Sequence, residues 1–452
     1  MIFRGRRSRS AGRRFVEAAR NLRPTRAAGD LRWKDAARAS GFLSNLSTVF
    51  VCNSAAFFLQ FCVLIVVARA WGPALYGQVT LVGNITALLF IPFSMGLNNA
   101  MYRVLPIADE RRQRALIDTA LLGNIVNVVA LGGVFLLSYR LLARSLTVSF
   151  EVWRSALLYS AATNFVCVFE SFLRGKQRYG AIGTIRITSA LLFFLAMIVV
   201  VFALDMRSLV AYYAVYSACY AVVFVALVSI TLKITCFHAQ WRLYLVILRY
   251  GFVMMLGLLL TALLYNSDII ILNALVFDKT QIGMFAAYQG VVKLIFYIGF
   301  HEIFTVVFLP TIAGSDRKTV FYKLKRLRLV IFALVSLVCA AIISVTLWLF
   351  GDQYLFSPLY LALSAANIGV FTLFQLFNAL ISMEGERGAR VSLRVVLLVL
   401  PVALALQVAL ARSWGAPGMM AALAATNLCL LGLMQLCADR FYRDQTSVQW
   451  LR

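Results

Sequence analysis

The stretch ARAWGPALYGQVTL at residues 68–81 separates two long apolar runs. It contains the pair Gly72 and Pro73, preceded by Trp71 and followed by a second glycine, Gly77. Glycine and proline interrupt helices, and tryptophan is common where a helix leaves a membrane. The stretch therefore predicts a hairpin turn between two membrane-spanning helices, in which Pro73 ends one helix and Gly77 restarts the next.

The composition around this turn is that of a membrane protein. Of the 452 residues, 62% are apolar and 13% are charged, whereas soluble domains average about 45–50% and about 25%. Apolar runs long enough to cross a bilayer, about 20 residues, recur from residue 43 to residue 437. Strands of a membrane barrel would alternate with period two, which these runs do not. The sequence predicts an all-α polytopic membrane protein.

The predicted helices number about twelve. We expect them at residues 43–68, 77–102, 117–140, 153–173, 181–204, 208–232, 250–274, 281–311, 329–350, 358–383, 391–411 and 416–437.

The net charge of +25 follows the topology of these spans. Of the 43 Lys and Arg residues, 35 lie in the N-terminal segment, the even-numbered connections and the C-terminal segment, and 7 lie at the opposite face. The positive-inside rule then places both termini in the cytoplasm. Because the basic residues are explained by topology, we expect no nucleic-acid partner.

Two sequence echoes indicate an internal repeat. Residues 68–81 resemble 273–288, and residues 172–187 resemble 382–395, with nearly the same separation in the sequence. Alternatively, glycines and basic residues populate such loops without a repeat. A repeat of six helices in the same orientation predicts two lobes about an axis along the membrane normal, with a central cavity between them. The expected organisation is a disordered basic tail (1–41), an N-lobe (42–235), a C-lobe (236–438) and a C-terminal tail (439–452).

Two motifs in the first half carry a family resemblance. Gly72, Pro73, Tyr76 and Gly77 form G-P-x-x-[YF]-G, and the segment FSMGLNNAMYRVLP at 93–106 follows. That segment contains G-L-x-x-A-x-x-R, made by Gly96, Leu97, Ala100 and Arg103. In the second half, SDIIILNALVFDKTQIGMFAAY contains Asp268, Gly283, Phe285 and Tyr288, with looser alanine spacing.

Together these motifs resemble the polysaccharide-transporter family of the multidrug/oligosaccharidyl-lipid/polysaccharide exporter (MOP) superfamily, which includes O-antigen and exopolysaccharide flippases. The resemblance covers about residues 43–437. It implies a flippase that carries undecaprenyl-pyrophosphate-linked oligosaccharides from the inner to the outer leaflet of the bacterial inner membrane. A lipid-linked glycan is then the expected substrate, with alternating access coupled to a proton or sodium, and glycan polymerase or assembly proteins as partners.

The second half holds the main candidate site residues. Ionisable groups inside spans cost about 2.5–3.5 kcal/mol each, so they usually face a cavity or the protein interior. Lys293 near mid-membrane and Asp268 on the preceding span would meet across a helical hairpin. We hypothesise that Lys293 binds pyrophosphate and that Asp268 balances its charge or carries a proton. The alternative is a structural ion pair. The other predicted cavity residues on these spans are Tyr265, Gln289, Tyr297 and His301.

The first half offers Asn53 and Gln60, whose amides suit sugar hydroxyls or hold helices together. Arg103, Arg186 and Arg394 lie at expected inner helix ends, where basic side chains usually reach toward the interface. They are candidates for an inner gate or for loading of pyrophosphate, and Glu170 completes this group. Glu170 also has Arg174 four residues on, which is typical of a local salt bridge.

Other functions are less compatible with the sequence. A polymerase or glycosyltransferase of glycan assembly would need an acidic outer loop, whereas the first outer loop, WGPALYG, has no acid. A multidrug exporter of the same superfamily stays open. The 8 cysteines form no C-x-x-C pair and the 2 histidines are far apart, so we expect no metal site and no cofactor.

Overall fold

The computed structural model describes residues 31–105, 109–141, 148–176, 178–232, 239–276, 278–296, 317–382 and 384–449. The chain divides into two compact units, Met1–Ser47 and Thr48–Arg452. The second unit contains the helices that are long and apolar enough to cross a membrane.

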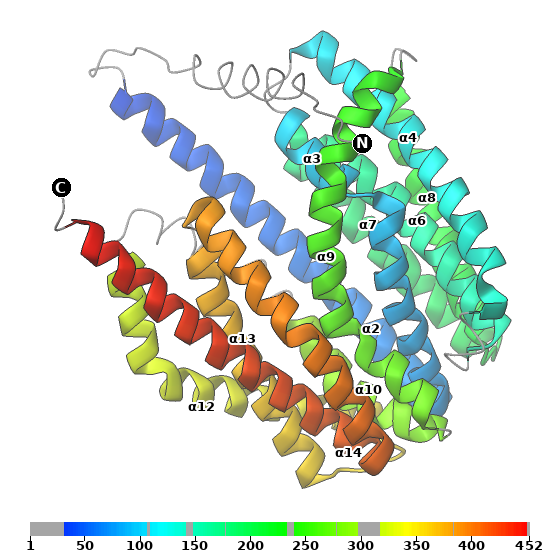
Figure 1. Ribbon diagram of the computed structural model, residues 1–452. Coiled ribbons are helices and arrows are strands. Elements are labelled where there is room, and N and C mark those ends of the chain that lie inside the picture. Colours follow the sequence, from blue (N-terminus) through cyan, green and yellow to red (C-terminus); the bar gives the residue numbers. More distant parts are fainter. Residues whose placement is uncertain are drawn as a thin grey trace, which may run out of the picture. The chain divides into compact units, whose positions relative to one another are not determined.

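The chain is helical, and no strand occurs in the described ranges. Helix α2 begins at Leu31, so its helical backbone includes the end of the expected tail 1–41. The elements are α2 (Leu31–Ser94), α3 (Leu97–Val104), α4 (Glu110–Leu137), α6 (Phe150–Gly175), α7 (Tyr179–Ile198, continued by the π-helical turn Val199–Ala203), α8 (Leu209–Leu232), α9 (Trp241–Leu275), α10 (Lys279–Phe296), α12 (Arg317–Phe350), α13 (Pro358–Ser382) and α14 (Gly385–Gln449) (Figure 1).

Two of these helices contain a break. In α2 the backbone leaves the helical region at Gly72 (φ 74°, ψ 175°), and in α14 it does so at Gly415 (φ 62°, ψ −134°). A positive φ of this kind is accessible mainly to glycine. The break predicted within residues 68–81 is therefore confirmed. The prediction that Gly77 restarts the helix is wrong, because the backbone is already helical from Pro73 onward.

The number of helices agrees with the prediction of about twelve. Within the described residues, 9 stretches are long and apolar enough to span a membrane. Two of them, in α2 and α14, contain the glycine breaks and so comprise two segments each. Helix α10 is a further segment, whose expected continuation to residue 311 lies outside the described residues. The chain is an all-α, multi-pass membrane protein.

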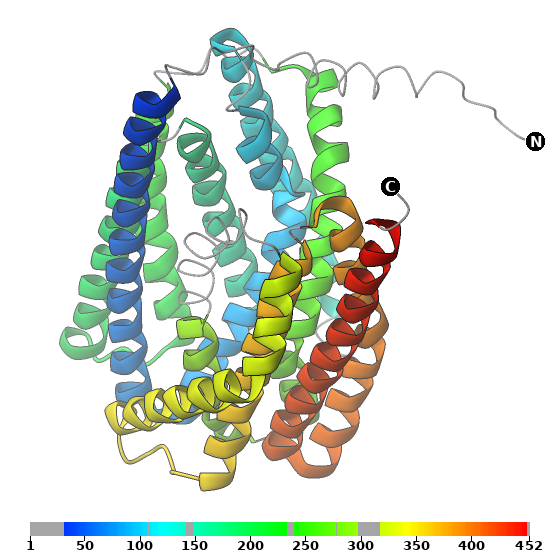
Figure 2. The same cartoon turned by 90° about the vertical axis from the view of Figure 1, so that its left-hand side faces the viewer.

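The helices pack in two sets. Helices α3, α4, α6, α7 and α8 contact one another, and so do α9, α10, α12, α13 and α14. The segments coloured yellow to red lie together in both views (Figure 1, Figure 2). Between the sets, α9 also contacts α3 and α4. This grouping follows the proposed division of the chain near residue 236, which stays a proposal.

Helices α2 and α3, from the first half of the chain, approach the second set closely at glycines. A Cβ atom on Gly77 would lie 2.7 Å from the backbone nitrogen of Gly283, and one on Gly283 would lie 1.8 Å from the carbonyl oxygen of Pro73. Gly77 and Gly283 are matched positions of the proposed repeat. If the two halves are related by a twofold axis, residues next to that axis contact the matching residues of the other half. The contact between Gly77 and Gly283 is therefore what the repeat predicts. A second close approach joins Gly96 to Gly251, where an added Cβ on Gly96 would lie 2.1 Å from the Gly251 carbonyl oxygen.

Candidate functional site

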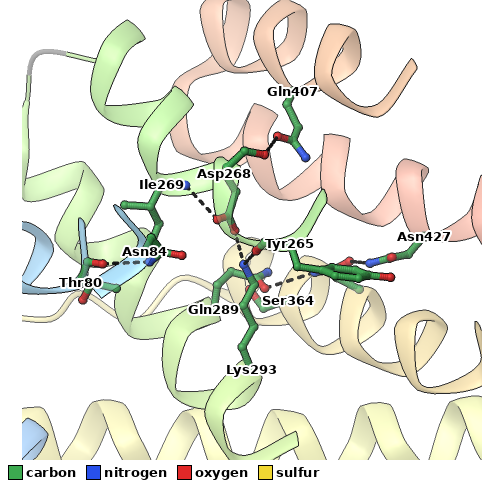
Figure 3. A network of polar contacts seen from close by, with 12 residues as sticks. Thr80, Asn84, Tyr265, Asp268, Ile269, Gln289, Lys293, Ser364, Gln407 and Asn427 are labelled. Carbon is green, nitrogen blue, oxygen red and sulfur yellow. Dashed lines mark hydrogen bonds and ion pairs between the residues drawn. The ribbon is translucent and has the colours of Figure 1, made fainter. Parts of the chain in front are cut away.

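Asp268 on α9 and Lys293 on α10 form an ion pair within the second half of the chain (Figure 3). The Asp268 side chain is fully buried, and that of Lys293 is 27% exposed. Lys293 Nζ also donates to the carbonyl oxygen of Tyr265 at 3.1 Å. The other carboxylate oxygen of Asp268 accepts from the backbone N–H of Ile269 at 2.9 Å. The structure thus brings together the cation and the carboxylate that the sequence placed on one hairpin.

The hairpin that carries this pair is fixed at its tip. The Lys279 ammonium, at the start of α10, donates to Asn273 Oδ1 on α9 at 2.6 Å. Asp278 accepts from the backbone N–H of Thr280 at 2.9 Å, in the manner of a residue that caps a helix N-terminus. These contacts hold α9 and α10 together near their connection, which constrains the register at which Asp268 meets Lys293.

A chain of buried amides lies beside the ion pair. Gln289 Nε2 donates to Ser364 Oγ at 3.0 Å, and Gln289 Oε1 accepts from Asn367 Nδ2 at 3.2 Å. Asn367 Oδ1 in turn accepts from Asn427 Nδ2 at 2.7 Å. The chain therefore connects α10, α13 and α14. Interhelical hydrogen bonds of this kind stabilise the packing of helices in a bilayer.

Several buried polar atoms in this region have no hydrogen-bond partner among the described residues. The Tyr265 ring packs edge-on to Phe371, with ring centroids 4.6 Å apart, and its hydroxyl is one of these atoms. Buried polar atoms are nearly always hydrogen-bonded, so they are candidates to bind water or a polar ligand. The others in the second half are Gln407 Nε2, Gln435 Nε2, Ser336 Oγ, Thr426 Oγ1 and Asn427 Oδ1.

A second charged cluster lies in the first half, around Glu170 on α6. Arg186 on α7 donates to both oxygens of this carboxylate, from Nε at 3.0 Å and from Nη2 at 2.9 Å. Arg186 Nη1 donates to Asn53 Oδ1, in the first segment of α2, at 2.5 Å. Arg174 Nη2 lies 3.6 Å from the same carboxylate. Two guanidinium groups thus share one carboxylate, and three helices meet there.

A close helix approach positions this cluster. At Gly183, one turn before Arg186, an added Cβ would lie 2.5 Å from Cys52 Sγ. The missing side chain lets α7 lie close to α2, next to Asn53. Arg186 and Asn53 can then reach each other although they are 133 positions apart in the sequence.

The remaining predicted site residues lie elsewhere. Gln60 is partly buried in the first segment of α2, and Arg394 is exposed on α14. Arg103 lies in α3, but its side chain is outside the described residues. Tyr297 and His301 also lie outside the described residues. Of the group Arg103, Arg186, Arg394 and Glu170, the structure shows only Arg186 joined to Glu170.

Sequence reasoning missed several members of these clusters. Ser267 Oγ donates to Gln407 Oε1 at 3.1 Å and so joins α9 to α14 beside Asp268. Gln407, Asn367 and Asn427 are amides inside long apolar runs. The same signal had drawn attention to Asn53 in the first half, and could have identified these residues as well.

Residues 42–315, more than half of the chain, match the family described as polysaccharide biosynthesis protein. The chain belongs to this family. The resemblance found in the sequence motifs is therefore confirmed. No curated protein sequence matches the chain.

Solved structures of the MOP superfamily show the same fold. A lipid II flippase MurJ in an inward closed conformation has a TM-score of 0.66 at 13% identity, covering 86% of this chain and 87% of its own. An inward-facing multidrug resistance MATE family transporter has a TM-score of 0.64 at 16% identity, covering 86% and 96%. A MOP superfamily transporter from Pyrococcus furiosus has a TM-score of 0.56 at 14% identity, covering 88% and 95%. At these identities the likeness shows the fold.

Proposed function

We propose that this protein is a flippase for lipid-linked oligosaccharides in polysaccharide biosynthesis. It would move undecaprenyl-pyrophosphate-linked repeat units from the inner to the outer leaflet of the bacterial inner membrane by alternating access. The family match carries this proposal, because it assigns a chain with a transporter fold to polysaccharide biosynthesis. The likeness to a structure of a lipid II flippase supports it, since that protein moves a lipid-linked substrate.

The charged groups within the helices fit this function. Transport of a glycan and a pyrophosphate through a bilayer needs polar groups inside the protein, while the polyprenyl chain stays in lipid. Both halves contain such groups, namely the Asp268–Lys293 pair and the cluster around Glu170. We assign the Asp268–Lys293 pair to ion coupling, because protonation of Asp268 would release Lys293.

The orientation follows from the distribution of basic residues. Lys and Arg residues gather at one end of four helix pairs, where α3 leads to α4, α6 to α7, α8 to α9 and α13 to α14. They are Arg111, Arg112 and Arg114 at the start of α4, Lys176 and Arg178 between α6 and α7, Arg242 and Arg249 in the first turns of α9, and Arg387, Arg390 and Arg394 in the first turns of α14. The charges at this end lie close together: burial and then the charges of Arg178 and of Arg114 in α4 lower the pKa of Lys176, and Glu110 raises it. By the positive-inside rule this end of the bundle faces the cytoplasm, and both termini lie there.

A deletion strain tests the function. Loss of the gene should cause lipid-linked repeat units to accumulate in the cytoplasmic leaflet. Enzymatic labelling of the glycans measures this, because glycans in that leaflet are labelled in opened spheroplasts and not in sealed ones. Purified protein in liposomes should speed the movement of a lipid-linked oligosaccharide between leaflets. A multidrug-sensitive phenotype without such accumulation would instead indicate a drug exporter, and a change in glycan polymerisation with normal translocation would indicate an enzyme of glycan assembly.

A further inference from the structure

The cluster around Glu170 carries more positive than negative charge. Arg186 holds both carboxylate oxygens in a two-pronged contact, and Arg174 contacts one of them. One carboxylate therefore serves two guanidinium groups. Lys176 follows at the end of α6, where burial and then Arg178 and Arg114 lower its pKa and Glu110 raises it, so basic groups outnumber acidic ones here as well. The surroundings therefore favour an additional anion.

The cluster also has a donor that is not in use. Asn53 is 8% exposed, and its Oδ1 is occupied by Arg186. Its Nδ2 is buried and has no acceptor among the described residues. An unused buried donor next to two guanidinium groups matches the needs of a ligand that offers several oxygen acceptors. The side chains of Arg186 and Arg174 are 27% and 35% exposed, so such a ligand can reach them.

Phosphate oxygens have the chemistry that fits these donors. Guanidinium groups bind phosphates in the same two-pronged manner in which Arg186 binds the carboxylate of Glu170. The pair in the second half differs, because the charges of Lys293 and Asp268 cancel and Lys293 also bonds to the Tyr265 carbonyl. The first half therefore has the better site for a phosphate group.

We propose that Arg186, Arg174 and Asn53 bind the pyrophosphate of the lipid-linked substrate, and that Glu170 is an internal anion that occupies the site until the substrate displaces it. The proposal rests on the flippase function. Two arginines without an anion would be costly at a partly buried site, and Glu170 removes that cost in the empty protein. Because the pyrophosphate must displace the Glu170 carboxylate to bind, and the carboxylate can return, the substrate is held weakly enough to be released.

Binding to the full-length protein in phosphatidylcholine nanodiscs tests this assignment. The probe is undecaprenyl pyrophosphate, and undecaprenol, which has no phosphate, is the control lipid. We expect Arg186→Gln to weaken binding of the probe by at least about tenfold, and Asn53→Ala and Arg174→Gln to weaken it less. Arg154→Gln, at an exposed position on the same helix α6, should leave binding unchanged.

Glu170→Gln separates the proposal from a purely structural salt bridge. If Glu170 competes with the substrate, this variant binds the probe more tightly than wild type, and its transport turnover slows because nothing helps to release the substrate. The variant Arg186→Lys keeps the charge and should recover only part of the binding. Unfolding midpoints identify variants that fail to fold. The double variant Glu170→Gln/Arg186→Gln is a further control, because it removes the carboxylate and Arg186 together and so leaves neither of them without the other.

Three results would overturn the proposal. They are a folded Glu170→Gln protein that binds the probe no more tightly than wild type, a folded Arg186→Gln protein with unchanged binding, and displacement of the probe by phosphatidylglycerol at equal concentration. The last would mean that the site takes ordinary anionic lipid. Transport of a lipid-linked oligosaccharide by the wild-type protein in liposomes tests the flippase function separately. If wild type transports and the variants behave like it, the function stands and only the assignment of this site fails.

Discussion

The two charged sites within the helices are built differently. In the second half, one lysine and one aspartate form a pair whose charges cancel, and Lys293 has a backbone carbonyl as a further acceptor. In the first half, Glu170 is shared by two arginines, and the amide of Asn53 adds an unused donor. The first arrangement is the one that we propose for ion coupling, and the second suits an anionic ligand.

On the function that we propose, this difference would give each half a separate task. A carboxylate paired with one cation changes the local charge when it is protonated. A site with excess positive charge instead gains an anion, and its arginines need no proton transfer because they stay charged. A transporter that couples an ion to an anionic substrate needs both kinds of site, and here they lie in different halves that meet at glycine contacts.

The largest expected effect comes from breaking the ion pair of the second half. Lys293→Met leaves the fully buried carboxylate of Asp268 without its cation, and Asp268→Asn leaves the lysine without its anion. Each single change should lower the free energy of unfolding by about 3–5 kcal/mol. The double variant Asp268→Asn/Lys293→Met leaves no unpaired charge and should lose much less. Unfolding of the purified protein in detergent measures all three.

Transport by the double variant then decides between the two interpretations of this pair. If the pair only fixes the register of α9 and α10, the folded double variant should transport a lipid-linked oligosaccharide at close to the wild-type rate. Ion coupling predicts that it folds but that an imposed ion gradient no longer drives transport. Gradient-driven transport at the wild-type rate by the double variant would contradict the role assigned to the pair.

The contact between the halves gives the next largest effect. Gly283→Ala would place a methyl group 1.8 Å from the Pro73 carbonyl oxygen, so the helices must separate or shift. Forced overpacking of this kind typically costs about 1–3 kcal/mol. Unfolding midpoints measure the cost, and labelling of a cysteine introduced at Gln281 measures whether the contact has opened.

Glycines on the same helices provide matched controls for this change. Among the described residues, an added Cβ on Gly290 of α10 would have only Thr80 Cγ2 nearby, at 3.8 Å, and one on Gly83 in the second segment of α2 would have no atom within 4 Å. Gly290→Ala and Gly83→Ala should be tolerated. Alanine favours a helix more than glycine does, so helix propensity alone would stabilise both variants. Equal destabilisation by Gly290→Ala and Gly283→Ala would therefore show that the contact between the halves does not determine the effect.

Much of this arrangement was predictable from local sequence. Long apolar runs predicted the helices, because only a helix satisfies its own backbone in lipid. The positive φ at Gly72 occurs within the stretch that predicted a turn. Asp268 and Lys293 were expected to lie in one cavity because they are ionisable groups inside two consecutive spans that form one hairpin. Their contact confirms that inference about geometry, while their role stays a proposal.

What the sequence did not predict depends on contacts between distant helices. Gly77 was expected to restart a helix, but its position is explained by the backbone of Gly283 on another helix. The spacing of Glu170 and Arg174 predicted a local salt bridge, which the structure contains, but it did not predict the closer contact of Glu170 with Arg186 on α7. The spacing of residues along one helix does not reveal which other helix packs against them.

A smaller effect is expected from the amide chain beside the ion pair. Asn367 both donates to Gln289 and accepts from Asn427, whereas Asn427 makes one of these bonds. Hydrogen bonds between membrane helices average about 0.6 kcal/mol, with a maximum near 1.7. Asn367→Ala should therefore cost about 1–2 kcal/mol and Asn427→Ala about 0.6 kcal/mol in unfolding experiments. The reverse order would contradict the chain of bonds described for α10, α13 and α14.

The smallest effect on stability is expected for Tyr265→Phe. This variant tests whether the site around Asp268 and Lys293 also contacts water or substrate. The Tyr265 hydroxyl is buried and has no partner among the described residues, so its removal deletes no protein hydrogen bond. The edge-on contact of the ring with Phe371 is retained. Since burial of an unpaired hydroxyl is unfavourable, the variant should be as stable as wild type or slightly more so. If its transport of a lipid-linked oligosaccharide nevertheless falls, the hydroxyl binds water or substrate during the cycle, and the two sites share the ligand. Unchanged transport would limit the second site to ion coupling and leave recognition of the substrate to the first.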